Sequence, residues 1–500
     1  MDEINEPRKY PGNPFPQIDP HVAAAWKFRV VTPPDGSATV YVADSLLLSC
    51  PASEVQERVE LIKKVAQELG ISVDFVPLGV MAKIGIERAK NRSTMSKLVL
   101  LGEPADLDAW RLLVHLRQVG AGKGVSLDHA MTAAQASSGQ WEGPNYSGTP
   151  YYVGAPYYVG AGTPAASYGF PGAGGRSPVT VVLPDPCVPA PPGQRAPVVV
   201  IPDTGLEEHP WFEDPETATA NVFVSGELLG RKGTVSGSAT PEPVRNPLDG
   251  TLLPLAGHGT FIAGIIRQIC PTAVILGIPV MTDDGVVSES CLIATLNSLL
   301  SRQEEALISG DTAELIDVLS LSLGYYHEAP EDQTADAPLC ELLERFGELG
   351  VAVVSAAGNS STTAPMYPAA FAANTPVHGK LPLVGVGALN PDKTVAYFSN
   401  AGSWVSCHRA GAAVVSTMPT HLRGDRQMIA TLNGADPQRS TIDPDDFTGG
   451  FGVWSGTSFA APVLAAELAR HMVDSTEPVA EKRVDLGWVA YAKVLEWTRP

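Results

Sequence analysis

The sequence predicts an α/β fold in which a parallel β-sheet is covered by helices on both faces and is preceded by a small α+β domain. Two patterns support this prediction. From residue 196 onward, continuous apolar runs of strand length alternate with helical patterns, as in parallel sheets that are buried on both faces. In residues 28–133, shorter alternating strands and two amphipathic helices indicate a separate unit.

Composition narrows the class of protein. The 500 residues, 44% of them hydrophobic, are enough for roughly two to four domains with sizeable cores. The net charge of −20 argues against nucleic acid as a partner, because the phosphates would repel the chain. The N-terminus lacks a signal-peptide pattern and no apolar run is long enough to cross a membrane. We therefore expect a cytoplasmic protein without a membrane partner, with non-classical export left open.

Proline and glycine mark an arm and a linker. The first twenty residues hold five prolines, and residues 1–27 are expected to form a disordered arm. Residues 134–195, rich in Gly, Pro, Ala, Ser and Tyr, are expected to form an exposed linker. Within this linker, a strand-like run at 179–183 is expected to dock on the domain that follows.

Residues 28–133 follow the order strand, helix, strand, strand, helix, strand, which is the order of a ferredoxin-like α+β domain. Ser53 and Gln56 form a predicted capping box at the start of the first helix. The expected strands are 38–49, 71–75, 98–101 and 125–129, and the expected helices are 53–69 and 106–120.

Residues 196–500 are expected to form the larger α/β domain. Binding sites in such domains lie at the carboxyl ends of the parallel strands. Residues 473–500 carry apolar side chains, including Val484, Trp488 and Val489, and are expected to form a tail that packs back on the domain. The expected strands are 198–201, 274–278, 318–323, 351–355 and 383–386, and the expected helices are 261–269, 290–300, 340–349 and 459–471.

Two polar residues lie at the expected site edge of the sheet. Asp203 follows a buried strand, where it is either an acid at the edge of a site or an ordinary turn residue. His258 stands between two glycines at a helix start, where it is either a base or a histidine satisfied by its own backbone. Each residue alone leaves both alternatives open.

Two further residues complete a chemical set. Ser458 precedes an Ala-rich helix whose N–H groups can face an anion, although serine there is also a common N-cap. Asn359 follows another strand and could donate to an oxyanion, although Asn after Gly is also a turn residue. The conjunction of an acid, a base, a nucleophile and an amide donor in one sheet favours nucleophilic catalysis.

With these residues in the order Asp, His, Ser, the chain resembles the subtilisin-type serine peptidases, which share that order. The resemblance covers residues 196 to about 472 and implies the subtilisin-like parallel sheet. The motifs that carry it are Asp203–Gly205, His258–Thr260, Ser322–Gly324, Ala357–Asn359, Phe398–Trp404 and Gly456–Pro462.

The resemblance implies a catalytic role for each of the four residues. Ser458 would attack the scissile carbonyl, His258 would accept its proton, and Asp203 would orient the imidazole. Asn359 and the backbone N–H of Ser458 would form the oxyanion hole.

The resemblance also implies two substrate-binding segments. Ser322, Leu323 and Gly324 would pair with an extended substrate as an added strand. Small residues would line the S1 pocket and leave room for a large apolar side chain; they are Ala356, Ala357 and Gly358.

We therefore expect a serine endopeptidase that hydrolyses peptide bonds in proteins and peptides through an acyl-enzyme. The alternative is a catalytically silent relative that binds peptides or proteins. The resemblance also implies that residues 28–133 are a prodomain that inhibits the enzyme until the linker is cleaved, although an unrelated binding module has the same strand order. No cofactor is expected. Structural calcium is common in the family, but no motif supports a site, and Asp443–Asp446 is expected to be a solvated loop.

Overall fold

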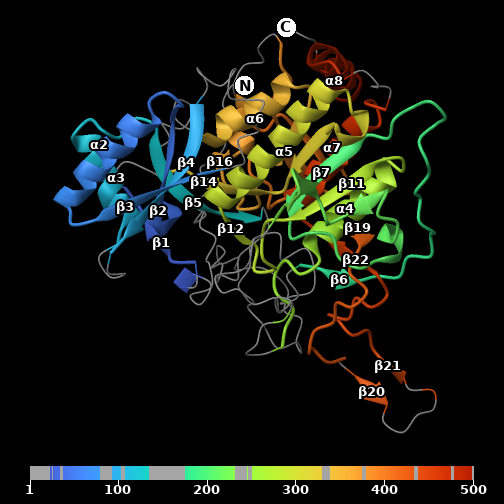
Figure 1. Ribbon diagram of the computed structural model, residues 1–500. Helices are drawn as coiled ribbons and strands as arrows, with labels where there is room; N and C mark the ends of the chain where they lie inside the picture. Colours follow the sequence, from blue (N-terminus) through green and yellow to red (C-terminus); the bar gives the residue numbers. More distant parts are fainter. Residues whose placement is uncertain are drawn as a thin grey trace, which may run out of the picture.

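The computed structural model places the chain in two packed units (Figure 1). Residues 28–133 form the N-terminal unit, and residues 175–497 form the second unit. The expected arm at 1–27 lies almost entirely outside the described residues, and so does the expected linker up to residue 174. The described residues are 23–24, 26–33, 38–78, 93–102, 107–133, 175–230, 245, 250–328, 338–373, 379–428, 430–432, 437, 439–473 and 478–497.

The N-terminal unit has an antiparallel sheet covered on one face by two helices. Its strands pair in the order β5-β2-β4-β3, and β1 pairs with the first half of β2. The sequence predicted the order of these elements except for β1, which it missed. The elements are β1 (Phe28–Val31), β2 (Thr39–Pro51), α2 (Val55–Glu68), β3 (Ser72–Pro77), β4 (Ser93–Leu101), α3 (Ala109–Gln118) and β5 (Val125–Ala133).

The two helices of this unit begin differently. The predicted capping box does not form, because the N-cap of α2 is Glu54 and no side chain caps the helix. The Asp108 side chain caps α3 and accepts a hydrogen bond from the Trp110 N–H. Burial of residues such as Ile62 and Leu112 in the core of this unit therefore contributes more to helix placement than a predicted cap.

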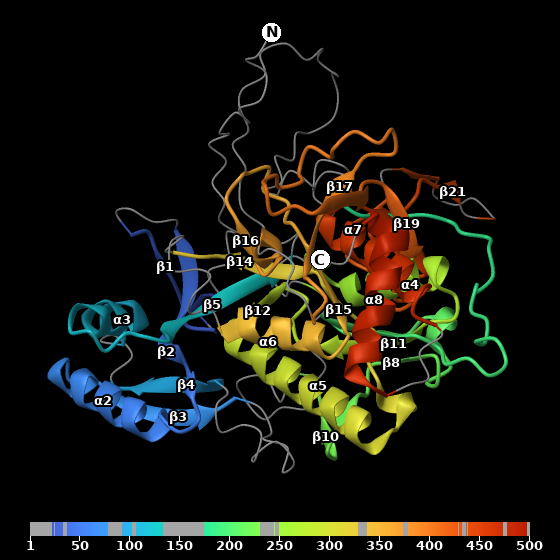
Figure 2. The same ribbon diagram turned by 90° about the horizontal axis from the view of Figure 1, so that it is seen from above.

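The other face of this sheet packs against the second unit. Helices α5 (Glu289–Ser309) and α6 (Pro338–Glu348) lie against strands of the N-terminal sheet (Figure 2). Strand β5 runs beyond its own unit and pairs with β14 (Leu323–Tyr326) and β12 (Val286–Ser288) of the second unit. One sheet therefore continues from the N-terminal unit into the second unit.

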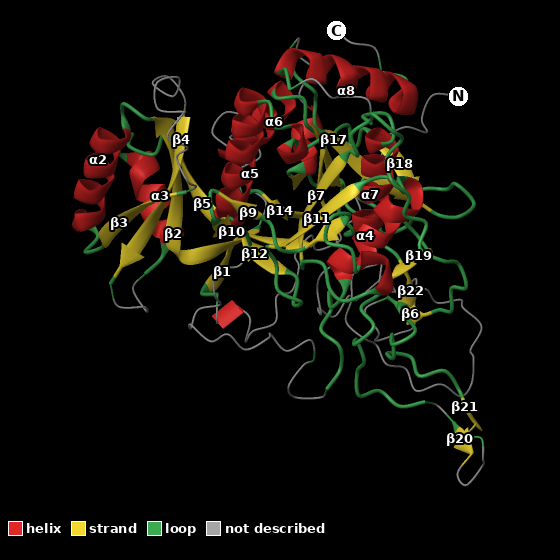
Figure 3. Ribbon diagram, turned by 45° about the vertical axis from the view of Figure 1, so that its right-hand side comes forward, coloured by secondary structure: helices red, strands yellow, loops and turns green. Residues whose placement is uncertain are grey.

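The second unit is built on a parallel sheet in the order β18-β17-β15-β13-β7-β11-β8. Helices α4 (His258–Ile269) and α7 (Thr457–Ala469) cover one face, and α5 and α6 cover the other (Figure 3). The predicted α/β class, with helices on both faces, is therefore confirmed. The strands are β7 (Val198–Asp203), β8 (Ala218–Thr219), β11 (Val274–Pro279), β13 (Val318–Leu321), β15 (Ala352–Ala356), β17 (Val384–Leu389) and β18 (Cys407–Ala410).

The structure corrects one strand and adds several short elements. The expected strand 318–323 is divided at Ser322, where the chain leaves the parallel sheet after β13 and enters β14. The short elements have too few residues for a recognisable period. They are β6 (Ser177–Pro178), β9 (Phe223–Val224), β10 (Glu227–Leu228), β12, β16 (Met366–Tyr367), β19 (Val414–Thr417), β20 (Thr431–Leu432), β21 (Arg439–Ser440), β22 (Phe451–Trp454), η3 (Pro210–Phe212), η4 (Thr312–Glu314) and η5 (Ala369–Ala373).

The described end of the expected linker packs on the second unit. Strand β6 pairs with β22, and the buried Arg176 guanidinium donates hydrogen bonds to three backbone carbonyls, among them that of Ala256. The expected docking of residues 179–183 holds only at the first residue, because the Val179 N–H donates to the Phe451 carbonyl at 3.2 Å whereas Val182 is 89% exposed.

The C-terminal tail forms a helix, α8 (Ala480–Leu495), that packs on the second unit. Val484 and Trp488 are buried as expected, whereas Val489 is exposed. Among the described helices, none has the length and apolar character needed to cross a membrane.

Candidate active site

Asp203 and His258 form a buried pair at one edge of the parallel sheet. Asp203 is the last residue of β7, and His258 is the first residue of α4. His258 Nδ1 lies 2.7 Å from Asp203 Oδ1, and both side chains are fully buried. The Thr204 N–H also donates to Asp203 Oδ1, at 2.8 Å, and so holds the carboxylate in place.

The glycines beside His258 are required by close contacts. Gly257 has a φ of 81°, and a Cβ there would lie 2.7 Å from Pro419. A Cβ on Gly259 would lie 2.1 Å from the Gly205 carbonyl oxygen. A side chain at position 259 would push α4 away from the turn after Asp203, and one at position 257 would push it away from Pro419.

Ser458 lies in the first turn of α7, close to this pair. Its hydroxyl donates to the Ser322 carbonyl at 3.3 Å, and the Ser322 hydroxyl donates to the Ser458 carbonyl at 3.0 Å. The His258 ring lies 5.4 Å from the ring of Phe459, the next residue along the chain. The structure thus brings the starts of α4 and α7 together, with His258 in the first turn of α4 and Ser458 in the first turn of α7.

Asn359 is fixed by the residue before Ser458. Its Oδ1 accepts hydrogen bonds from the Thr457 N–H at 2.8 Å and from the Thr457 hydroxyl at 2.9 Å. Its Nδ2, in contrast, has no hydrogen-bond partner among the described residues. Because Oδ1 is used, the amide can turn only its N–H groups toward the site.

Three polar atoms of the site are buried without a partner in the described chain. They are Asp203 Oδ2, His258 Nε2 and Asn359 Nδ2. Leaving a polar atom buried and unpaired costs about 1–3 kcal/mol, so folded proteins seldom do it without a function. The His258 ring packs on Phe459 and Asn359 bonds Thr457, so two of these atoms belong to side chains that contact the residues on either side of Ser458.

The expected substrate-binding edge is already paired with another strand. Leu323 pairs with Ala133 and Gly324 pairs with Thr132, both antiparallel. On its other side the same stretch of β5 pairs with β12. The end of β5 therefore lies between two strands of the second unit, as an extended peptide would.

The expected S1 residues form a buried turn after β15. Ala356 ends β15, Ala357 and Gly358 form the turn, and Gly358 has a φ of 100°. The Gly358 N–H donates to the Thr457 hydroxyl at 3.0 Å. A Cβ at Gly358 would lie 2.4 Å from Met366 Sδ, so only glycine fits there.

Sequence reasoning assigned no role to Asn400, although it lies in the Phe398–Trp404 motif. Its Nδ2 donates to the Ala357 carbonyl and to the Tyr326 hydroxyl, each at 2.9 Å. Its Oδ1 accepts from the Ser360 N–H at 3.0 Å. Asn400 is fully buried and holds the turn that carries Asn359.

His209 is a buried neutral histidine at the start of η3. Its Nδ1 accepts from the Trp211 N–H at 3.0 Å, and its Nε2 lies 2.9 Å from the Gly450 carbonyl, to which it donates. Burial lowers the pKa of His209 to about 4, and the bond to Gly450 offsets only part of that shift.

The Asp443–Asp446 segment differs from the expected solvated loop. Asp445 is only 3% exposed, and burial raises its pKa. Its Oδ2 accepts from the Arg426 N–H at 3.3 Å. The expectation fails at Asp445 alone, because a partly exposed acidic loop can still fold one carboxylate inward to satisfy a backbone group.

Comparison with known families identifies the class of protein. The family model described as Subtilase family (Peptidase_S8) matches residues 194–481, which is more than half of the chain. The chain therefore belongs to the subtilase family.

Curated relatives give the degree of similarity. The chain is 30% identical to Subtilisin DY of Bacillus licheniformis over 172 residues, or 33% of this chain and 55% of that protein. It is 26% identical to Subtilisin-like proteinase Mp1 of Magnaporthiopsis poae over 245 residues, which are 48% of this chain and 50% of that protein. It is 25% identical to an Intracellular serine protease of Paenibacillus polymyxa over 211 residues, which are 38% of this chain and 58% of that protein. The chain thus spans about half the length of the curated relatives it matches.

A solved structure also matches over much of the chain. Fervidolysin from Fervidobacterium pennivorans, described as a keratinolytic enzyme related to subtilisin, matches with a TM-score of 0.44 at 16% identity. The match covers 89% of this chain and 56% of that chain.

Proposed function

We propose that the chain is a serine endopeptidase that cleaves peptide bonds in proteins and peptides. The placement of the His258 imidazole carries this proposal. Its Nδ1 lies 2.7 Å from Asp203 Oδ1, and its Nε2 is buried without a partner among the described residues. An imidazole held by a carboxylate at Nδ1, beside a serine at a helix start, is suited to act as a general base through Nε2.

In the proposed reaction, Ser458 Oγ forms a bond to the scissile carbonyl carbon while its proton passes to His258 Nε2. Rotation about the Ser458 Cα–Cβ bond exchanges the Ser322 carbonyl for the imidazole as acceptor. Asp203 keeps the ring in place and stabilises its positive charge. His258 then donates the proton to the leaving amine, and water releases the acyl group by the same steps.

The developing oxyanion is proposed to bind at the start of α7. Asn359 Nδ2–H and the backbone N–H of Ser458 are the donors, and the positive end of the helix dipole adds to their effect. Thr457 fixes the Asn359 Oδ1 and so points the amide N–H groups at the site.

The N-terminal unit is proposed to be both the inhibitor and the first substrate of the enzyme. Thr132 and Ala133 pair with Gly324 and Leu323, where a substrate strand would bind. Ala133, the last described residue of β5, pairs with the neighbour of Ser322, whose carbonyl accepts from the Ser458 hydroxyl. We therefore expect self-cleavage soon after Ala133, inside the predicted linker.

Substrate side chains are proposed to enter an S1 pocket lined by Ala356, Ala357 and Gly358, with room for a large apolar residue. The cytoplasmic location and the absence of a required cofactor stay predictions from the sequence.

Labelling with a fluorophosphonate tests the proposed activity. We expect the processed parent protein to carry the label on Ser458, identified by peptide mass spectrometry. The His258→Ala variant should not be labelled, because the hydroxyl then lacks its base. Ser455→Ala is the matched control, since the Ser455 hydroxyl accepts from the Ala413 N–H and takes no part in the proposed reaction. No label on a folded, processed parent would reject the peptidase and favour the silent peptide-binding relative.

A further inference from the structure

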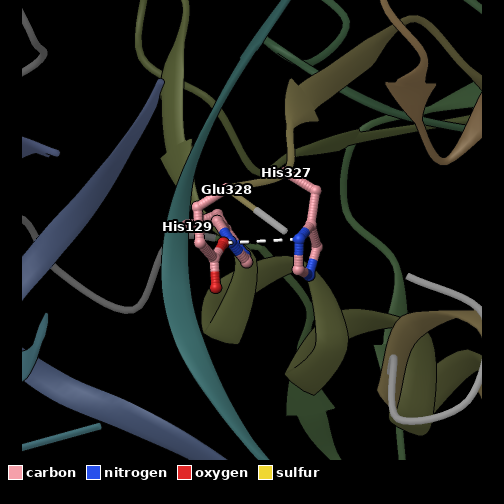
Figure 4. A group of neighbouring side chains, drawn as sticks. All are labelled: His129, His327 and Glu328. Atoms are coloured by element: carbon pink, nitrogen blue, oxygen red, sulfur yellow. Dashed lines mark hydrogen bonds and ion pairs between the residues drawn. The ribbon is translucent and has the colours of Figure 1, made fainter. Parts of the chain in front are cut away.

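A buried cluster of two histidines and two glutamates lies where β5 enters the second unit. His129 is on β5, and His327 and Glu328 follow β14, so the cluster is shared between the two units (Figure 4). The antiparallel register of β5 and β14, continued beyond Thr132 and Gly324, places His129 opposite His327. Their ring centroids are 5.2 Å apart.

Three potential ligand atoms converge in this cluster. Glu328 Oε2 lies 3.0 Å from His129 Nε2 and 3.4 Å from His327 Nδ1, and all three atoms lie within 4.8 Å of one another. Atoms that bind one tetrahedral zinc ion at about 2.0–2.1 Å lie roughly 3.3 Å from each other. The two carboxylate–histidine separations are therefore close to those of a zinc site with two histidines and one carboxylate, and the two histidine nitrogens lie within 4.8 Å of each other.

The surroundings of His129 are those of a metal ligand. Its Nδ1 lies 2.6 Å from Glu289 Oε2, so this carboxylate can hold the Nδ1–H tautomer and leave the Nε2 lone pair for an ion. Tyr325 stacks on the imidazole at 4.3 Å and limits its rotation. Glu289 and Glu328 are both buried, with 1% and 0% of their side chains exposed.

The charge balance of the cluster also favours a cation. Two buried carboxylates, Glu289 and Glu328, contact the His129 imidazole, and Arg117 Nη2 lies 3.5 Å from Glu328 Oε1. Buried carboxylates require positive charge beside them, which a metal ion or a proton on the cluster supplies. Glu328 Oε1 accepts no hydrogen bond from the described residues.

We propose that His129, His327 and Glu328 bind a divalent transition-metal ion of the zinc type, with Glu289 orienting His129. Because His129 belongs to the N-terminal unit and the other two ligands belong to the second unit, the ion fastens β5 in the substrate-binding cleft. The metal site itself is independent of the proposed peptidase activity, whereas its role as a latch rests on that function.

The competitor for this position is a proton. Burial lowers the pKa of His129, but the hydrogen bonds to Glu289 and Glu328 outweigh it and raise the pKa to about 10. A proton between His129 and Glu328 joins one imidazole to one carboxylate, whereas a metal ion would also bind the His327 imidazole.

Cobalt binding to the full chain tests the site. The Ser458→Ala chain, kept at full length and stripped with a chelator, should bind one equivalent of Co²⁺ with the visible absorption of a four-coordinate ion, and Zn²⁺ should displace it. His327→Ala and Glu328→Gln should abolish this absorption, and Glu289→Gln should weaken binding about 10- to 100-fold. The control His421→Ala removes a surface histidine and should bind Co²⁺ as the parent does. Thermal unfolding checks that each variant is folded.

Two results would overturn the metal site. One is a folded parent that binds no Co²⁺, which means that the cluster holds only a proton. The other is unchanged Co²⁺ binding in folded His327→Ala and Glu328→Gln, which means that the ion binds elsewhere.

The latch is tested on the chain with Ser458 intact. Zn²⁺ should slow the release of the N-terminal unit from the parent and should not slow it in His327→Ala. Equal release with Zn²⁺ and with chelator would overturn the latch. A parent that is never cleaved would contradict the proposed function instead, and the Co²⁺ result would be unaffected by it.

Discussion

Replacing Asn359 by leucine removes both interactions of its amide at nearly constant volume. The Nδ2 group has no hydrogen-bond partner among the described residues and is the proposed oxyanion donor. The Oδ1 atom accepts from the Thr457 N–H at 2.8 Å and from the Thr457 hydroxyl at 2.9 Å. The substitution should therefore affect both the reaction and the start of α7.

The two effects have different magnitudes. Loss of one oxyanion donor lowers kcat by roughly 10²–10³-fold, a range known from subtilisin itself and carried over here to Asn359. KM should change little, because the donor acts mainly on the transition state. Without Oδ1 the buried Thr457 N–H loses its acceptor, which should lower the free energy of unfolding by about 1–3 kcal/mol.

Hydrolysis of a chromogenic peptide anilide by the processed enzyme measures kcat and KM, and urea unfolding measures stability. Thr457→Ser is the matched control, because serine keeps the hydroxyl and the N–H that contact Asn359. A kcat of the Asn359→Leu variant within about threefold of the parent would refute the assignment of Asn359 as a donor.

Two further predictions concern stability. Asp317→Asn should lower the free energy of unfolding, measured in urea, by about 3–5 kcal/mol, because fully buried Asp317 pairs with fully buried Arg483 at 2.9 Å. The control is Asp311→Asn, at an exposed position. An equal loss of unfolding free energy in the two variants would contradict this prediction. The pKa of His209 in the folded protein is about 4, below its usual value of about 6.5. Burying neutral His209 therefore contributes fully to the free energy of unfolding above pH 6.5. This contribution is lost as the pH falls toward 4, by up to about 3 kcal/mol. The melting temperature should fall more steeply over this range in the parent than in His209→Gln, and equal slopes would count against the explanation.

Local patterns were sufficient to predict the parallel sheet, whereas each candidate site residue alone also had an ordinary structural alternative. The run of residues 198–201 is apolar at every position because β7 is buried on both faces, and this is visible in the sequence. Close contacts or a positive φ require glycine on both sides of His258 and at position 358. These glycines are therefore visible as parts of short sequence motifs. The pairing of Asp203 with His258, which lie 2.7 Å apart, was expected from the resemblance to subtilisin-type peptidases.

Contacts between distant short segments could not be predicted from the sequence. Strand β5 extends to Ala133 because β12 and β14 provide partners for its end, and neither partner is longer than four residues. The ion pair of His129 with Glu328 joins residues 199 positions apart, and no spacing rule connects them. The capping box at Ser53 fits a local rule, but the helix begins at Val55 instead.

The N-terminal sequence of the processed chain tests the central claim most directly, because it depends on the nucleophile, its base and the register of β5 together. We predict that the parent protein acquires a new N-terminus at the start of the predicted linker, soon after Ala133, and that the Ser458→Ala chain, expressed and incubated beside it, stays at full length. A parent that stays intact, or a Ser458→Ala chain cleaved at the same bond in the absence of other peptidases, would contradict the account.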